Sequence, residues 1–495
     1  MPLFENTIKP AQNKYSNILK WGTFYFIIYL FIHIHLIHRQ GLHIDEVIDF
    51  NGSNSDIYLA AGRWGLFWYR KVMGTGIFPI TAGLIAGIYI AIAIFLQTSL
   101  FKFDNNFLRG TYGLIYIACN QWQTQLEYSH QSDAVALALL LCTIGVYLLS
   151  EEHKKLFLSI LCFTLAVSVY QTCALYFLVI WSCFIVANRQ LNIRNVAHFT
   201  IVSIISLAVY FAIAHFFKHS DLITVETRLF VTKYQSNLSQ WDEFINLDFR
   251  TQALFILHYC KTALVEALGF SKQSSIFQPF IIIPLIYLIV IKLKQGFTYP
   301  NFLYALVLVG IWIEPFLMHI ILPGYTPTRT LLAEPVALGF LSMATIKHSP
   351  CIRQYKNIIL IGIGFVLFKA AYSNTANARN SAHHHNLLVR ELNNMHLAGN
   401  LLAQQNGIIS AKIILLHEPN KQSKKHPYVH LNLIYGILDR NDLHWYTSHL
   451  RLSNLIQSDS QLYEKHKNIY HEMPCWPEAG SIRIHQGDII IRVTP

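Results

Sequence analysis

The stretch DAVALALLLCTIGVYLLSEEHKKLFLSILCFTLAVSVYQTCALYFLVIWSCFIVA (133–187) decides the fold class. It contains three apolar runs, at 133–150, 157–170 and 172–187, and the short segment EEHKK (151–155) lies between the first two. Apolar runs of this kind are typical of helices that cross a bilayer, because a helix satisfies all of its own backbone groups there.

The composition of the whole chain agrees with this stretch. Of 495 residues, 53% are apolar and only 13% are charged, against about 25% charged in a soluble domain. These values exclude a disordered chain, a collagen-like repeat and a small disulfide scaffold. The net charge of +11 is spread in twos and threes between apolar runs, so we expect no nucleic-acid partner.

We predict a mainly α, polytopic membrane protein with about eleven transmembrane helices. The first apolar run lacks a small-residue cleavage site, so we interpret it as an anchor helix. Two short runs, 111–120 and 157–170, either extend into polar neighbours or are broken within the protein interior. The eleven runs are 21–38, 77–97, 111–120, 133–150, 157–170, 172–187, 198–217, 276–292, 301–322, 331–346 and 358–373.

Basic residues in short loops predict the orientation. One set of alternate loops holds fourteen Lys and Arg residues and the other set holds five. By the positive-inside rule the N-terminus is cytoplasmic, and an odd number of spans places the C-terminus outside. In a bacterium this protein would lie in the inner membrane with its outer segments in the periplasm.

Two domains are expected. Residues 1–373 form the transmembrane domain, with outer loops at 39–76 and about 218–275. Residues 374–495 are more polar and form a small soluble α/β domain on the outer side. Within it, 386–405 shows helical periodicity with Gly407 as a C-cap, 411–417 is a strand, and SIRIH followed by IIIRV is a hairpin.

The first outer loop carries the most informative polar residues. Asp45 and Glu46 are adjacent acids shortly after the first span, and Arg63 follows inside the amphipathic segment 57–72. Acids at the membrane interface can acquire a raised pKa that suits a general base, and an arginine is a natural contact for phosphate. The alternative is that the acids are solvated and Arg63 snorkels to the interface.

Four further residues lie at the same predicted membrane depth. His130 and Asp133 precede and open the fourth apolar run, although Asp133 could instead cap its helix and His130 could be a surface residue. Gln171, after Tyr170, interrupts the apolar stretch 157–187. Arg329 is the one basic residue in its short outer loop.

Four patterns along the chain together resemble a known family. They are the acidic pair followed by Gly62-Arg63, the sequence Ser132-Asp133-Ala134, the pair Tyr170-Gln171, and the tail sequence MPCWPEAGSI (473–482). In order and topology the chain resembles the type II glucosyltransferases among the serotype-converting O-antigen enzymes. The family pattern often has two Asp where this chain has Asp45-Glu46, so which member is the base stays open.

The resemblance implies a GT-C-like membrane glycosyltransferase. Such an enzyme moves a sugar, typically glucose, from a polyprenyl-phosphate carrier to a lipid-linked O-antigen or related surface glycan on the periplasmic side. It would depend on a carrier-lipid glucosyl synthase and a flippase, and it would contact membrane lipids. Asp45 and Glu46 would be catalytic, and Arg63, His130, Asp133, Gln171 and Arg329 would bind substrate.

Other functions fit parts of the sequence. A flippase or transporter for a lipid-linked saccharide explains the spans, although no internal repeat is evident. An O-antigen polymerase also has many spans and large outer loops, and a binding protein without activity is a third alternative. The sequence assigns no certain cofactor, and the clustered acids leave a divalent cation open.

Overall fold

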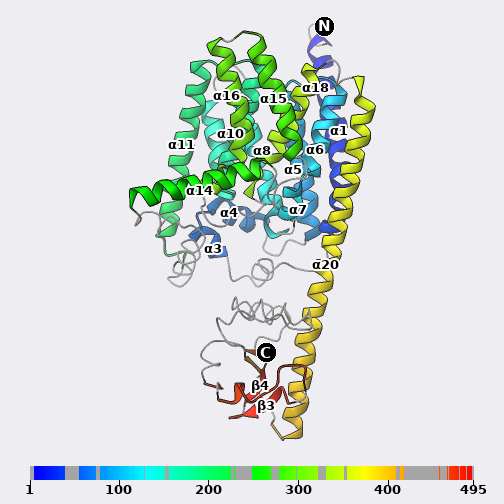
Figure 1. Cartoon of the computed structure of the whole chain (residues 1–495), viewed down its shortest axis with the longest axis vertical. Helices are drawn as coiled ribbons and strands as arrows, with labels where there is room; N and C mark the ends of the chain where they lie inside the picture. Colours follow the sequence, from blue (N-terminus) through cyan, green and yellow to red (C-terminus); the bar gives the residue numbers. More distant parts are fainter. Residues whose placement is uncertain are drawn as a thin grey trace. The chain divides into compact units, whose positions relative to one another are not determined.

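The computed structural model shows a mainly helical chain with one small sheet (Figure 1). Contacts between residues divide the chain into two compact units, with a boundary between Thr375 and Ala376 in the helix α20. The structure describes residues 5–38, 55–73, 79–126, 129–150, 155–223, 228, 248–268, 278–296, 298–321, 330–349, 354–408, 413–416, 456–457, 465–466, 468–478, 480–486 and 488–492.

The first unit is made of helices. They are α1 (Glu5–Ile37), α3 (Ser55–Ala60), α4 (Trp64–Met73), α5 (Pro79–Leu100), α6 (Asn106–Ala118), α7 (Asn120–Leu126), α8 (Ser129–Ser150), α9 (Leu156–Val169), α10 (Cys173–Asn188), α11 (Ile193–Lys218), α14 (Phe249–Ala267), α15 (Gln278–Lys294), α16 (Tyr299–Ile313), the 3₁₀ helix η1 (Glu314–Leu317), α17 (Met318–Ile321), α18 (Glu334–His348) and the first part of α20 (Lys356–Gln405).

Membrane-length helices support the predicted class of protein. Each of the eleven predicted runs overlaps a helix. In the described residues, six helical segments are long and apolar enough to cross a bilayer, so the count of eleven stays a prediction. The six segments are Asn17–Ile37, Ile80–Leu100, Gln131–Ser150, Ile193–Lys218, Tyr299–Leu317 and Lys356–Ala376.

A buried polar network ties four helices of the first unit together, namely α5, α6, α8 and α10. The Gln97 side chain on α5 donates to the Tyr176 hydroxyl on α10 at 2.6 Å and accepts from the Tyr112 hydroxyl on α6 at 2.6 Å. Gln97 also donates to Thr143 on α8, and the Tyr116 and Tyr176 hydroxyls lie 2.7 Å apart. Polar side chains that meet between helices fix helix packing where water is absent.

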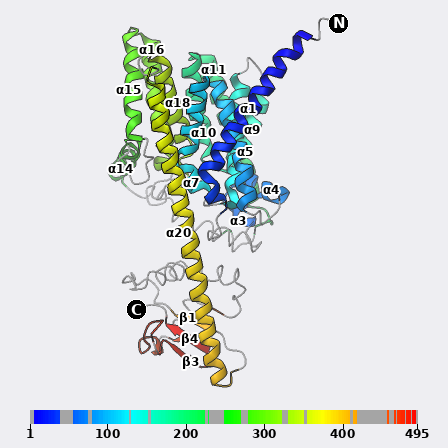
Figure 2. The same cartoon turned by 90° about the vertical axis from the view of Figure 1, so that its right-hand side faces the viewer.

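Two breaks in helical structure lie at the same end of the helical unit. The predicted amphipathic segment 57–72 is not one helix, because the chain turns at 61–63 between α3 and α4. Tyr170 has an extended backbone and ends α9, and α10 begins three residues later at Cys173. Figures 1 and 2 show α3 and α4 at this end, and α14 lies across the neighbouring helices there.

The second unit contains the predicted strands. β1 (Ile413–Leu416), β2 (Ile456–Gln457), β3 (Ile482–His485) and β4 (Asp488–Arg492) form a sheet with the order β2-β1-β4-β3. β1 is parallel to both neighbours, and β3 and β4 are antiparallel. Ile414 and Ile490 form a core with Tyr470 and Met473. The predicted strand and hairpin are therefore confirmed, and the side of the membrane stays a prediction.

The helix α20 differs from the sequence prediction. The span 358–373 and the helix 386–405 were expected as separate elements, whereas one helix runs from Lys356 to Gln405. The intervening residues contain neither Gly nor Pro, so nothing in them stops a helix. Gly407, at φ +69°, follows the end of the helix as predicted for its C-cap.

Candidate functional site

Arg63 lies in the turn between α3 and α4, where a glycine makes the turn possible. Gly62 adopts φ +76°, a conformation that disfavours other residues. A Cβ atom on Gly62 would also lie 2.9 Å from the hydroxyl of Tyr210 on α11. The turn closes when the Arg63 amide donates to the carbonyl of Tyr58 at 2.7 Å. The position of Arg63 is therefore set by close packing of α3 on α11.

Three side chains orient the guanidinium group of Arg63. Its Nε donates to Oε1 of Gln171 and its Nη1 donates to Oε1 of Gln131, both at 3.3 Å. The guanidinium carbon lies 5.1 Å from the ring centre of Tyr170. Gln171 is held in turn, because its amide donates to the Ala61 carbonyl at 3.0 Å and to the Tyr210 hydroxyl at 3.2 Å.

A buried ion pair lies on the neighbouring helices. Arg70 on α4 binds Asp133 on α8 through two contacts, Nη1 to Oδ2 at 3.2 Å and Nη2 to Oδ1 at 2.5 Å. The Tyr69 hydroxyl and the Ala134 amide donate to the same carboxylate at 3.0 and 2.8 Å. Both side chains are buried. Asp133 lies in the second turn of α8, which begins at Ser129, so it is not the cap of this helix.

The two arginines at this end differ in their hydrogen-bond partners. Asp133 neutralises Arg70, whereas the hydrogen-bond partners of Arg63 are two neutral amide side chains. Arg63 is partly buried, and its Nη2 has no hydrogen-bond partner among the described residues. A partly desolvated guanidinium in this state is suited to a phosphate or carboxylate ligand.

A second polar group surrounds α7. Gln121 donates a hydrogen bond to Glu334 at the start of α18, and both side chains are buried. Gln125 is also buried, and within the described part of the chain neither its amide nitrogen nor its oxygen has a hydrogen-bond partner. The hydroxyl groups of a sugar can donate to and accept from such an amide, and they would satisfy both of its atoms.

Comparison with known families decides the class of protein. The model of the family described as glucosyl transferase GtrII matches residues 36–346, which is more than half of the chain. The chain belongs to the GtrII glucosyl transferase family. No curated protein sequence and no solved structure matches it. The matched range contains all seven candidate site residues and ends before α20 begins at Lys356. The resemblance stated from the sequence is thereby confirmed.

Of the seven candidate site residues in this GtrII family member, the structure describes three in full, namely Arg63, Asp133 and Gln171. Arg63 and Gln171 are in direct contact, and Gln131 links Arg63 to the helix turn that holds Asp133. His130 lies in the first turn of α8, but its side chain is outside the described residues. Asp45, Glu46 and Arg329 also lie outside them. Their predicted roles as base and substrate contacts stay predictions.

Sequence reasoning missed four members of the arrangement in this glucosyl transferase, namely Tyr69, Arg70, Gln131 and Tyr210. One signal was available for Arg70, because it follows Arg63 by seven residues and so lies near the same face of a helix. Within the described residues no group of three His, Cys, Asp or Glu side chains could hold a metal ion. The acidic pair 45–46 is outside that search.

Proposed function

We propose that this GtrII glucosyl transferase moves glucose from a polyprenyl-phosphate carrier to a lipid-linked glycan on the outer side of the bacterial inner membrane. The glucosyl transferase class rests on the family match. The observation that carries the finer proposal is Arg63, a partly buried cation whose orientation is fixed by neutral side chains. The orientation of the chain rests on the bias of basic residues between its loops.

The donor is proposed from the place of Arg63 in the helical unit. A polyprenyl chain keeps its phosphate at the boundary of the hydrocarbon layer, so the phosphate contact must lie near the ends of membrane helices. Arg63 meets this requirement because it precedes α4 and contacts the break between α9 and α10. Exposed apolar residues on α4, such as Trp68 and Val72, suit the membrane interface.

The proposed reaction combines Arg63 with the acidic pair of the first outer loop. The acceptor hydroxyl loses its proton to a carboxylate, which we assign to Asp45 or Glu46, and its oxygen forms a bond to the anomeric carbon. The bond from that carbon to the phosphate oxygen breaks, and the carrier phosphate leaves with the electron pair. Arg63 stabilises the charge that develops on this phosphate. Attack from the face opposite the phosphate inverts the anomeric centre.

Asp133 and Gln171 have positioning roles in this proposal. Both oxygens of Asp133 already accept hydrogen bonds, so the carboxylate holds Arg70 and α4 against α8. Gln171 holds Arg63 directly. His130 and Arg329 remain proposed substrate contacts, with Arg329 as a second phosphate contact. The buried amide of Gln125 is a further candidate for contact with a sugar.

The second unit is proposed to lie on the same outer side and to help hold the acceptor glycan. Three of its aromatic residues are candidates for stacking on sugar rings, and two of them, Trp445 and Tyr446, lie outside the described residues. The third, Trp476, donates from its indole nitrogen to Glu391 of α20 at 3.3 Å. Trp476 therefore serves first to join the loop 473–478 to the helix.

A transfer assay tests the function. The full chain would be placed in proteoliposomes with synthetic polyprenyl-phosphate glucose and a purified lipid-linked acceptor, and the product mass and anomeric configuration would be measured. We expect a gain of one hexose per acceptor repeat with inversion, and loss of transfer in the variant Asp45→Asn/Glu46→Gln. Tight binding of the donor without turnover in the wild type would contradict the proposal and favour a flippase.

A further inference from the structure

A cavity lies at the opposite end of the helical unit from Arg63. The helix α10 connects the two places, because it begins two residues after Gln171 and ends one residue before Arg189, which lines the cavity. Its 16 residues correspond to roughly 24 Å of helix. The cavity has a volume of about 160 Å³, several times the ~30 Å³ that a water molecule occupies in the liquid.

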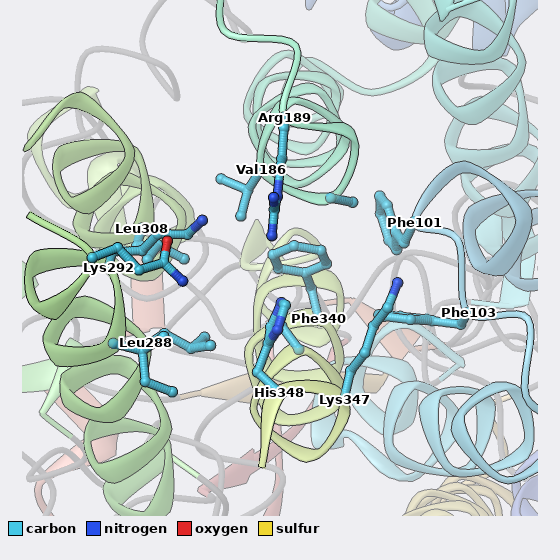
Figure 3. Close-up of a pocket in the computed structure, with 14 residues that line it drawn as sticks. Phe101, Phe103, Val186, Arg189, Leu288, Lys292, Leu308, Phe340, Lys347 and His348 are labelled. Atoms are coloured by element: carbon cyan, nitrogen blue, oxygen red, sulfur yellow. The ribbon is translucent and has the colours of Figure 1, made fainter. Parts of the chain in front are cut away.

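Basic side chains from three helix ends meet at this cavity. Arg189 follows α10, Lys292 lies in the last turn of α15, and Lys347 and His348 end α18. Figure 3 shows the nitrogen atoms of these side chains directed into the same space. None of the described residues that line the cavity is acidic. Helix dipoles favour cations at C-termini, but they do not require these side chains to converge.

Lys292 and Lys347 make described contacts with neutral groups beside the cavity. The Lys292 ammonium lies 5.2 Å from the ring centre of Tyr304, and Lys347 donates to the carbonyl of Lys102 at 2.9 Å. Asp104 is the described acid near Lys347, but its side chain is 84% exposed and paired with Arg109 at 3.8 Å. Positive charges that line one cavity repel one another, and an anion between them reduces the repulsion.

The walls of the cavity are apolar. The buried rings of Phe101, Phe103 and Phe340 form one side, and Leu288 and Leu308 form the side that faces them. On the outside of α15 and α16, Ile283 and Leu306 are exposed, as expected for helix surfaces that face acyl chains. The site therefore combines a cationic centre with an apolar surround, which matches an amphiphilic anion.

We propose that this cavity binds the phosphate headgroup of an anionic membrane phospholipid. Arg189, Lys292 and Lys347 contact the phosphate, and the acyl chains lie along the outer faces of α15 and α16. Basic pockets between membrane helices on the cytoplasmic side bind such headgroups, and the bias of basic loop residues predicts this end to be cytoplasmic. The lipid would clamp the ends of α10, α15 and α18, and the proposal is independent of the transferred sugar.

Lipid binding to the purified full chain tests the proposal. Retained lipid would be measured by native mass spectrometry, and thermal unfolding would be followed with added phosphatidylglycerol, cardiolipin, phosphatidylcholine or inorganic phosphate. The variant Arg189→Gln/Lys292→Gln/Lys347→Gln would be compared with Arg194→Gln/Lys294→Gln/Lys356→Gln. The control removes the same charge from the same end, outside the cavity lining.

We expect the two anionic lipids to bind and stabilise the wild type and the control, and phosphatidylcholine to have little effect. The cavity variant should bind them roughly 100-fold more weakly. If that variant does not fold, Lys292→Gln alone and the cavity-filling Ala344→Met should each weaken binding. Equal binding by cavity and control variants would overturn the site, and equal stabilisation by inorganic phosphate would overturn its assignment to a lipid.

Discussion

Arg70 and Asp133 form an ion pair that joins α4 to α8 with both side chains buried. Two hydrogen bonds connect the guanidinium to the carboxylate, and Tyr69 supplies a third donor. Since α4 begins one residue after Arg63, the pair fixes the segment that carries the proposed phosphate contact. The ion pair therefore supports the site while its own charges cancel.

Removing the carboxylate of this pair should destabilise the protein. In Asp133→Ala, Arg70 remains buried without a counter-charge, and breaking a buried pair in this way costs about 3–5 kcal/mol. Thermal unfolding of the purified variant in detergent would measure the loss. The double variant Arg70→Met/Asp133→Leu removes both charges and should recover most of the stability. A double variant no more stable than Asp133→Ala would show that the pair's charges are not the cause.

The substitution Gly62→Ala should reduce activity more than it reduces stability. Alanine is strained at φ +76°, and its Cβ would approach the Tyr210 hydroxyl to 2.9 Å. The turn must therefore shift, and it carries Arg63 with it. We expect at least a tenfold loss of glucose transfer. Gly364→Ala is the matched control, because a Cβ there meets no atom within 4 Å, and transfer should be unchanged.

The substitution Gln171→Glu should weaken the use of the donor. A carboxylate cannot donate to the Ala61 carbonyl or to the Tyr210 hydroxyl as the amide does. It would also neutralise Arg63, so the donor phosphate loses its partner. We expect a raised KM for the polyprenyl-phosphate donor and a lower kcat/KM in the transfer assay. Gln404→Glu on an exposed face of α20 is the control, and equal donor kinetics in both variants would refute the role of Gln171.

The second unit should lose stability in acid because of His466. Burial lowers the pKa of His466, the neighbouring Lys465 and His485 lower it further, and Asp488 opposes them. The fold thus favours the neutral ring, so its contribution is present above the ordinary pKa of about 6.5 and is lost as the pH falls through the lowered value. Hydrogen exchange of the full chain should show weaker protection of β3 and β4 near pH 5 than near pH 7.

The variant His466→Phe provides the comparison for this experiment. It keeps an aromatic ring at a fully buried position but removes the titrating group. Protection of β3 and β4 in this variant should change less between pH 7 and pH 5 than in the wild type. The same acid dependence in both proteins would assign the effect to another group.

The sequence predicts the helical class and part of the site for a physical reason. Long apolar runs dictate helices in a bilayer, and Arg63, Asp133 and Gln171 stand out because polar residues are rare in such surroundings. The partners Gln131 and Tyr210 could not be assigned, since their contacts with the site depend on how α8 and α11 pack. The turn at 61–63 was also missed, because it depends on the conformation of Gly62 and on the contact with Tyr210.

Close packing decides where α4 lies. The contact of Gly65 shows why the position of this helix could not be predicted from the sequence. Gly65 rests against Ser168 on α9 so closely that a Cβ atom would overlap the serine hydroxyl. This contact brings α4 beside the end of α9, just before Tyr170 and Gln171. Spacing along the chain gives no indication that residues about one hundred positions apart meet in this way.

The most direct test of the account compares two arginines in the transfer assay. Arg63→Ala would be measured against Arg194→Ala, which removes an exposed arginine at the opposite end of the helical unit. We expect Arg63→Ala to lower kcat/KM for polyprenyl-phosphate glucose by roughly 100-fold, Arg63→Lys to recover part of it, and Arg194→Ala to match the wild type. Equal kcat/KM in folded Arg63→Ala and Arg194→Ala would contradict the assignment of Arg63 to the leaving phosphate.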